Sequence, residues 1–209
     1  MIHDAALPHR GLRKRRVAGI TSNKLQQIDA GSWFNRAYRG LARLEYTRQT
    51  IPTLDDVFRL LANQPNKELI VYVELKAGRE RRKNDELAAA VIDLVDRYQL
   101  HSRVIVISFN LRTVARIKEL NSSICTGALF SPRQRVTKSS RQIIAAAVAS
   151  GAKQILLHHR IATKRIIAAA HKQSLMLVVW TVDDPHWLAR ARDLQVSAII
   201  TNHPAKMLA

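Results

Sequence analysis

The sequence is poor in cysteine, in glycine-rich loops and in long apolar runs, and each shortage excludes a class of protein. Cys125 is the single cysteine in 209 residues, so the chain cannot form an internal disulfide. No apolar run approaches the roughly 20 residues that a membrane-spanning helix requires. No glycine-rich phosphate loop follows a strand-like segment. No signal peptide is visible at the start of the sequence, which favours a cytoplasmic location.

Acidic residues are also scarce, since 16 Asp and Glu stand against 34 Lys and Arg, for a formal net charge of +18. A field of this sign attracts phosphate-bearing partners, which include nucleic acid, an anionic membrane surface and a phosphodiester substrate. Zinc-finger spacing, RNA-recognition signatures and interleaved aromatic runs are missing, so a solvated, arginine-rich surface is favoured over nucleic-acid binding. The charge by itself does not select a function.

The first fifty residues show no clear period, but beyond them apolar runs of strand length alternate with helical patterns. The runs are rich in Val, Ile and Leu, as expected for strands buried on both faces of a parallel sheet. The predicted strands are Leu69–Lys76, Val104–Asn110, Ile124–Phe130, Gln154–His159, Leu175–Val182 and Ala198–Asn202. The predicted helices are Leu54–Asn63, Glu86–Tyr98, Leu111–Leu120, Arg141–Ser150, Thr163–Gln173 and Pro185–Leu194.

Capping signals mark several of these helix ends. Thr53 with Asp56 resembles a capping box, and Asp85 can cap the next helix. Asp184 before Pro185 predicts a cap followed by proline at the first helical position. Gly151 follows an alanine-rich helix at a position where a left-handed residue is favoured.

Nearly every predicted strand finishes in polar or aromatic residues, among them Ser108 with Asn110 and Thr201 with Asn202. In a β/α barrel these ends all open onto one face, where the active site is built. A doubly wound sheet would concentrate them near one switch point. The sequence therefore predicts an α/β fold, a single domain over residues 1–209 with a TIM-type (β/α)8 barrel. A complete barrel needs about 250 residues, so this barrel is expected to be incomplete.

The strongest candidate for chemistry is the strand Leu69–Lys76. Side chains alternate along a strand, so Tyr72, Glu74 and Lys76 share the face that points into the barrel. A lysine beside a carboxylate at the catalytic rim suits a site for a metal and an anionic phosphate. A purely structural ion pair explains the same pattern equally well.

Other candidates carry weaker patterns. The imidazole of His3, next to Asp4, can shuttle protons. Trp180, Phe109 and Phe130 lie at strand ends, where they could line a pocket or simply cap the barrel core. His158 and His159 are adjacent on a predicted strand, so their side chains should point in opposite directions and at most one should face the site.

Eight short segments, taken in order, resemble the glycerophosphodiester phosphodiesterase family. They are Ile2–Asp4, Asp29–Phe34, Ile51–Asp55, Val73–Lys76, Ile107–Asn110, Gly127–Phe130, Val179–Val182 and Ile199–Pro204. Each segment is weak alone, but their joint order and spacing extend over nearly the whole chain. The resemblance implies a β/α barrel that hydrolyses glycerophosphodiesters to an alcohol and glycerol 3-phosphate with a bound Ca²⁺ or Mg²⁺.

The resemblance also implies roles for particular residues. His3 matches one of the two acid–base histidines, and Glu74 matches one carboxylate ligand of the metal. Lys76 matches a lysine near the phosphate, and Trp180, with Phe109 nearby, matches an aromatic at the substrate. The implied partner is a small phosphodiester molecule, and a nucleic-acid partner is not expected.

The chain departs from the family at its start. Two family segments have no counterpart before His3: the first strand, which carries a His-Arg-Gly motif, and the next strand, which carries Glu-x-Asp. The triplet His9-Arg10-Gly11 follows His3, whereas the family motif precedes the matching histidine. We therefore expect an N-terminally truncated member that lacks the first strands and has little or no activity. The alternatives are a non-catalytic barrel remnant that binds phosphate compounds or a partner and, on charge alone, a nucleic-acid-binding protein.

Overall fold

The computed structural model describes residues 16–208, except for the side chains of residues 135–137. By their internal contacts the residues form two units, one that ends at Pro65 and one that begins at Asn66. The candidate histidine His3, and the triplet His9–Gly11, lie outside the described residues.

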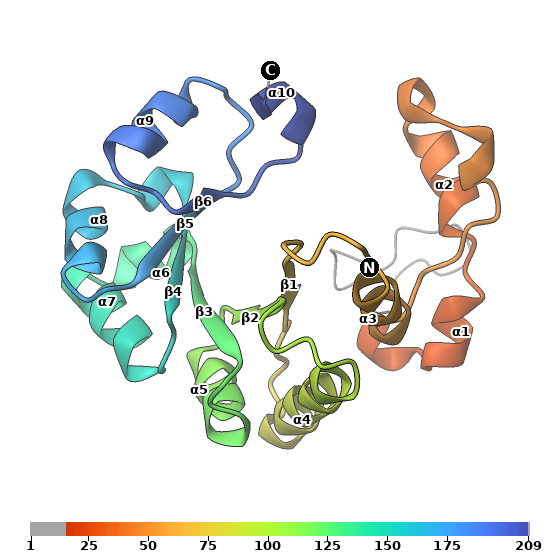
Figure 1. Ribbon diagram of the computed structural model, residues 1–209, viewed down its shortest axis with the longest axis horizontal. Helices are drawn as coiled ribbons and strands as arrows, with labels where there is room; N and C mark the ends of the chain where they lie inside the picture. Colours follow the sequence, from red (N-terminus) through yellow and green to blue (C-terminus); the bar gives the residue numbers. More distant parts are fainter. Residues whose placement is uncertain (1–15, 209) are drawn as a thin grey trace. The chain divides into compact units, whose positions relative to one another are not determined.

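The larger unit contains one sheet of six parallel strands that neighbour each other in chain order. These strands are β1 (Val71–Glu74), β2 (Val104–Ser108), β3 (Cys125–Phe130), β4 (Gln154–His158), β5 (Met176–Trp180) and β6 (Ala198–Ile199). The sheet curves, and its helices lie on the convex side (Figure 1). A doubly wound sheet would reverse its strand order, so the observed order is that of a barrel, here a parallel half-barrel of six strands.

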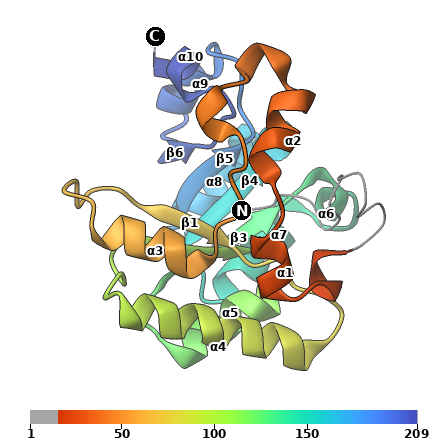
Figure 2. The ribbon, with the colours of Figure 1, turned by 90° about the vertical axis from the view of Figure 1, so that its right-hand side faces the viewer.

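A helix follows nearly every strand of this sheet. The helices of the unit are α4 (Arg81–Arg97), α5 (Leu111–Leu120), α6 (Pro132–Thr137), α7 (Ser140–Ala149), α8 (Lys164–His171), α9 (Trp187–Asp193) and α10 (Pro204–Leu208), with a 3-10 turn at His159–Ile161. Helices α4 and α5 pack against each other, and α4 runs lengthwise across the lower part of Figure 2. Helices α7 and α8 form a second such pair.

Two predicted helix starts are wrong. Helix α4 begins at Arg81 rather than Glu86, so Asp85 lies inside the helix, where its carboxylate is 3.8 Å from Arg81 Nε. Helix α9 begins at Trp187, and Asp184 Oδ1 instead accepts a hydrogen bond of 3.0 Å from the backbone N–H of His186. The prediction for Gly151 is confirmed by its φ of 72°.

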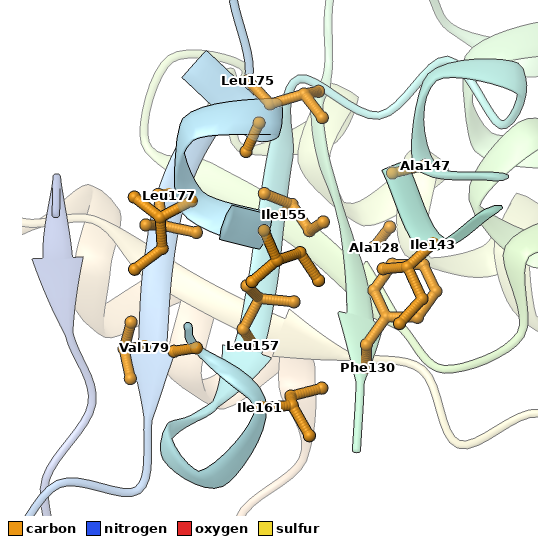
Figure 3. Packing of buried hydrophobic residues seen from close by; sticks show 14 of the residues in the cluster. Ala128, Phe130, Ile143, Ala147, Ile155, Leu157, Ile161, Leu175, Leu177 and Val179 are labelled. Carbon is orange, nitrogen blue, oxygen red and sulfur yellow. The ribbon is translucent and has the colours of Figure 1, made fainter. Parts of the chain in front are cut away.

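The main core lies between the sheet and helices α7 and α8 (Figure 3). Alternate residues of β3, β4 and β5 point to this side, and the buried stripes of the two helices meet them. The figure labels Ala128, Phe130, Ile155, Leu157, Leu177 and Val179 from the strands, with Ile143 and Ala147 from α7. Burial of this continuous apolar surface is the main term that favours folding of the unit.

The concave side of the sheet has a smaller core formed by Ile105, Ile107, Leu129, Leu156 and Val178. Tyr72 packs against it and donates a hydrogen bond of 3.0 Å to Gln154 Oε1, which confirms that Tyr72 points to the inside. A side chain at Gly127 would displace this core, because a Cβ would lie 2.4 Å from Leu156 Cδ1 and 2.9 Å from Ile107 Cγ2.

The smaller unit is helical. It contains α1 (Ser22–Gln26), α2 (Ala30–Ala37) and α3 (Leu54–Ala62), with 3-10 turns at Val17–Gly19, Arg39–Leu41 and Leu44–Tyr46. The expectation that the first fifty residues are irregular is therefore wrong for α1 and α2. The capping box of Thr53 and Asp56 is confirmed at the start of α3.

Over residues 16–208, every helix is too short or too polar to cross a membrane.

Candidate functional site at the strand ends

The carboxyl end of β1 carries the predicted ion pair. Glu74 Oε1 lies 3.3 Å from Lys76 Nζ, and the two side chains are 27% and 43% exposed. Between them Leu75 is buried, and its backbone is held on both sides. Its N–H donates to Ile107 O at 2.8 Å, and its carbonyl accepts from Ser108 Oγ at 2.7 Å. The fixed backbone of Leu75 therefore sets the direction of both charged side chains.

A hollow of about 620 Å³ lies beside this pair. Its walls come from two chain segments, Glu74 to Ala77 after β1 and Ser108 to Leu111 after β2. Asn110 caps α5 by accepting the N–H groups of Arg112 and Thr113, which fixes the second wall. Phe109 is 38% exposed, so this wall offers apolar surface close to the charged pair.

Trp180 reaches the same rim from the end of β5. Its ring meets that of Phe109 edge to face, with 5.6 Å between the centroids and 80° between the planes. Trp180 Nε1 donates a hydrogen bond of 3.2 Å to Leu156 O, and the ring packs on the concave core. The indole therefore packs on the concave core and contacts Phe109, and its role toward a substrate stays a prediction. Phe130, by contrast, is buried in the main core next to α7, so of its two interpretations the packing role applies.

His158 and His159 lie side by side instead of pointing apart. Their ring centroids are 4.3 Å apart, and the His158 ring also meets Trp180 at 4.9 Å and 82°. The expectation of opposite directions is wrong because β4 ends at His158 and His159 already begins a 3-10 turn. Strand alternation does not extend past the last strand residue. This imidazole pair next to Trp180 is a part of the site that the sequence did not predict.

The two imidazoles have different hydrogen-bond partners. His158 Nδ1 accepts the backbone N–H of Arg160 at 3.2 Å, and His159 Nδ1 lies 2.8 Å from Thr181 O. Burial lowers the pKa of His158 below its ordinary value of 6.5, and the neighbouring charges of His159 and Arg160 lower it further. His158 therefore stays neutral to a lower pH than a free histidine, and because its Nδ1 accepts the Arg160 N–H, its Nε2 carries the proton and is a hydrogen-bond donor.

The ends of β5 and β6 are tied together by Asp183. Its carboxylate accepts hydrogen bonds from the Asn202 N–H at 2.8 Å, from Asn202 Nδ2 at 3.0 Å and from Thr201 Oγ1 at 3.0 Å. The Asn202 N–H is the largest of the causes that lower the pKa of Asp183. Thr201 and Asn202, the polar residues at the end of the last predicted strand, therefore hold the rim together by binding the carboxylate of Asp183. The sequence did not predict a role for Asp183.

The described residues do not by themselves form a site for Ca²⁺ or Mg²⁺. Over residues 16–208 there is no group of three or more His, Cys, Asp or Glu side chains that could hold a metal ion. At β1 the carboxylate of Glu74 faces a lysine, whereas hard cations require several oxygen ligands. Glu74 can thus supply one ligand, and the set around it is incomplete.

Four of the five predicted site residues lie at the carboxyl ends of the strands: Glu74, Lys76, Phe109 and Trp180. The fifth, His3, lies outside the described residues. The first three border one hollow, and Trp180 joins them through its contact with Phe109. The rim thus combines the Lys76 cation, the carboxylates of Glu74 and Asp183, an apolar wall and two imidazoles. Such a combination can bind an anionic, partly apolar small molecule.

Comparison with known proteins gives a consistent result. The Glycerophosphoryl diester phosphodiesterase family matches residues 1–206. A glycerophosphodiester phosphodiesterase of Bacillus subtilis is 24% identical over 210 residues, which cover 98% of this chain and 69% of that protein. The crystal structure of a glycerophosphodiester phosphodiesterase from Parabacteroides distasonis superimposes with a TM-score of 0.75 at 19% identity, over 99% of this chain and 75% of the other. A phosphodiesterase from Oleispira antarctica, solved with its product sn-glycerol-3-phosphate, gives a TM-score of 0.79 at 19% identity, over 99% and 76%.

Proposed function

The chain belongs to the glycerophosphoryl diester phosphodiesterase family, and we propose that it hydrolyses glycerophosphodiesters to an alcohol and glycerol 3-phosphate at the strand ends. The observation that carries this proposal is the Glu74–Lys76 pair beside the Phe109 wall, at the carboxyl ends of parallel strands. The family match favours an enzyme over a non-catalytic remnant.

In the proposed reaction, water attacks phosphorus and the bond between phosphorus and the alcohol oxygen breaks. Negative charge grows on the phosphoryl oxygens, so a fixed cation close to them lowers the barrier. Lys76 supplies this cation, and Glu74 holds its ammonium group at 3.3 Å. Phosphate oxygens can replace the carboxylate as partners of the lysine, because a charged hydrogen bond to phosphate is also strong.

The apolar part of the substrate would lie against Phe109 and Trp180. Their edge-to-face contact and the hydrogen bond from Trp180 Nε1 hold both rings before any ligand arrives. A preformed wall loses little side-chain entropy on binding. We propose that this wall contacts the glycerol or the alcohol moiety of the diester.

Proton transfer to the leaving alcohol requires an acid–base group. By family resemblance we propose His3 for this role. His158 is a second imidazole at the rim, and its lowered pKa keeps it neutral near pH 7. Because its Nδ1 already accepts the Arg160 N–H, the proton of the neutral ring lies on Nε2, and we propose that Nε2 donates a hydrogen bond to the substrate.

A divalent cation is the usual requirement of this family. When bound, such a cation would add positive charge at the phosphate. We propose Glu74 as one of its oxygen ligands. The described residues supply no complete ligand set, so the roles proposed above are those of the chain's own side chains. Addition of EDTA, followed by Mg²⁺ or Ca²⁺, should lower and then restore the rate of hydrolysis.

The decisive test is hydrolysis of glycerophosphocholine by the purified chain and two variants. Glu74→Gln removes the rim carboxylate, whereas Glu86→Gln removes an exposed carboxylate on the outer side of α4 and serves as the control. We expect turnover by the wild type and the control, with a rate at least tenfold lower for Glu74→Gln. Equal rates for all three would exclude the proposed site, and no turnover with either cation would favour the non-catalytic remnant.

A further inference from the structure

The outer surface of helices α7 and α8 contains a groove that the proposed reaction does not use. It has a volume of about 490 Å³ and runs between the two helices. Its apolar floor includes Ile144, Ala145, Val148 and Ala169. Val148 is 44% exposed, whereas the inward residues of both helices are buried in the main core. We call this surface the α7–α8 groove.

Three cations border the α7–α8 groove: Arg141 in the first turn of α7, Arg165 in the first turn of α8, and Lys172 just after α8. All three are exposed. Within the part of the chain that the structure describes, none of them forms an ion pair with a carboxylate. The groove therefore joins apolar surface to uncompensated positive charge.

The sequence around the groove strengthens this charge. From Leu120 to Val182 the chain has no Asp and no Glu, while Lys and Arg recur throughout the segment. No carboxylate of this segment can therefore repel an anionic partner or neutralise the three cations. In the same unit, the exposed cations Arg81 and Arg82 of α4 each have a carboxylate partner on their own helix.

From the α7–α8 groove we infer a docking surface for an anionic phospholipid membrane. Cations above an apolar strip match a membrane interface, where headgroups carry negative charge and short apolar side chains enter between them. Nucleic acid fits less well, because the groove lining contains no aromatic side chain for stacking and its floor is apolar. Attachment would be peripheral and reversible, and it would place the enzyme next to a phospholipid surface.

The test measures sedimentation of the whole chain with vesicles of two compositions: phosphatidylcholine alone, and an equal mixture with phosphatidylglycerol. The test variant carries Arg141→Gln, Arg165→Gln and Lys172→Gln. The control carries Arg81→Gln, Arg82→Gln and Lys83→Gln on α4, which lowers the net charge equally. Circular dichroism melting of both variants checks that each remains folded.

We expect the wild type to bind only the mixed vesicles, with weaker binding at high salt because the charges are screened. The groove variant should bind roughly a hundredfold more weakly, since each cation near an anionic surface contributes about fivefold. The α4 control should stay within about threefold of the wild type, because its cations are already compensated.

Three outcomes would overturn the inference. One is a wild type that does not bind the mixed vesicles, and another is an equal loss in the two variants, which would make net charge the cause. The third is a groove variant that loses affinity for an oligonucleotide while vesicle binding is unchanged, which would indicate nucleic acid as the partner. None of these outcomes depends on hydrolytic activity, so the proposed function is tested separately.

Discussion

Two pairs of helices, α4 with α5 and α7 with α8, cover neighbouring parts of one sheet, yet the outer surfaces of the two pairs differ. On the first pair, several positive charges have carboxylate partners: Arg82 is 2.6 Å from Glu86, and Arg116 is 3.0 Å from Glu119. On the second pair there is no acidic residue, and Arg141, Arg165 and Lys172 border an apolar groove. Both pairs bury an apolar stripe against the sheet.

The rim also differs between the two sides of the sheet. The β1 and β2 side carries a carboxylate paired with a lysine, and the β4 and β5 side carries two imidazoles and an indole. Packing against the sheet restricts the inner stripe of each helix to apolar residues, whereas the residues of the outer surface and of the rim can differ between the two helix pairs. The predictions below test this separation, from the largest effect to the smallest.

The buried stripes of the two helix pairs should contribute equally to the free energy of unfolding. Ile117 of α5 and Ile143 of α7 are both fully buried, so Ile117→Ala and Ile143→Ala should each lower the free energy of unfolding by about 2–5 kcal/mol. Val148→Ala, at an exposed position on α7, should change it by less than about 0.5 kcal/mol. Urea unfolding of the three variants measures this. If only one of the two isoleucine variants lost less than about 1 kcal/mol, the buried stripes of the two helix pairs would contribute unequally to stability.

At the rim the two sides should differ in catalysis. Lys76→Met removes the proposed phosphate cation and keeps most of the side-chain length, so we expect kcat/KM for glycerophosphocholine to fall about 10²-fold. His158→Phe keeps a ring in contact with Trp180, and we expect a loss of less than about tenfold. Steady-state kinetics of both variants with the wild type test this. The opposite order of effects would assign the main role to the β4 and β5 side.

The β4 side should also show a distinct pH dependence. Because burial lowers the pKa of His158, the unfolded chain binds this proton more readily than the folded chain below pH 6.5. Stability should therefore rise as pH increases from the folded pKa to 6.5, and no further contribution is expected above that value. Thermal melting against pH should show a flatter acidic limb for His158→Gln. A slope identical to the wild type would mean that His158 is solvated in the folded state.

The smallest expected effects concern the outer surfaces. Glu86→Ala removes the partner of Arg82 on α4 and should cost about 0.3–0.5 kcal/mol. On α8, Ala168→Glu places a carboxylate four residues from both Lys164 and Lys172 and should gain a few tenths of a kcal/mol. Unfolding in urea at low and high salt would measure both changes. Equal values at the two salt concentrations would contradict an electrostatic cause.

Much of the larger unit was predictable from the sequence. Continuous apolar runs between helical patterns indicated six strands, all of which are present, and alternation along Leu69–Lys76 correctly directed Tyr72 to the inside. The observed strands are shorter than predicted, since the polar residues at their ends lie in the loops that form the rim. In the smaller unit α1 and α2 were not predicted, although the side chain of Asp29 caps α2 by accepting the backbone N–H of Ser32.

The site was less predictable, for two physical reasons. The stacking of His158 on His159 depends on where β4 ends and a 3-10 turn starts, and a shift of one residue reverses the expected side-chain direction. The Asp183 network joins groups 18 and 19 residues apart, which no local pattern reveals. The Glu74 and Lys76 pair was found because the two residues are only two positions apart in the sequence, although β1 ends at Glu74 and Lys76 follows it.

The order of the six strands has a consequence for how such a site can change over time. Each strand pairs only with its neighbours along the chain, and each contributes its own short loop to the rim. An insertion in one loop lengthens a single wall of the site and leaves the pairing of all strands intact. New substrate preferences can therefore arise one loop at a time, while the sheet that supports them is inherited unchanged.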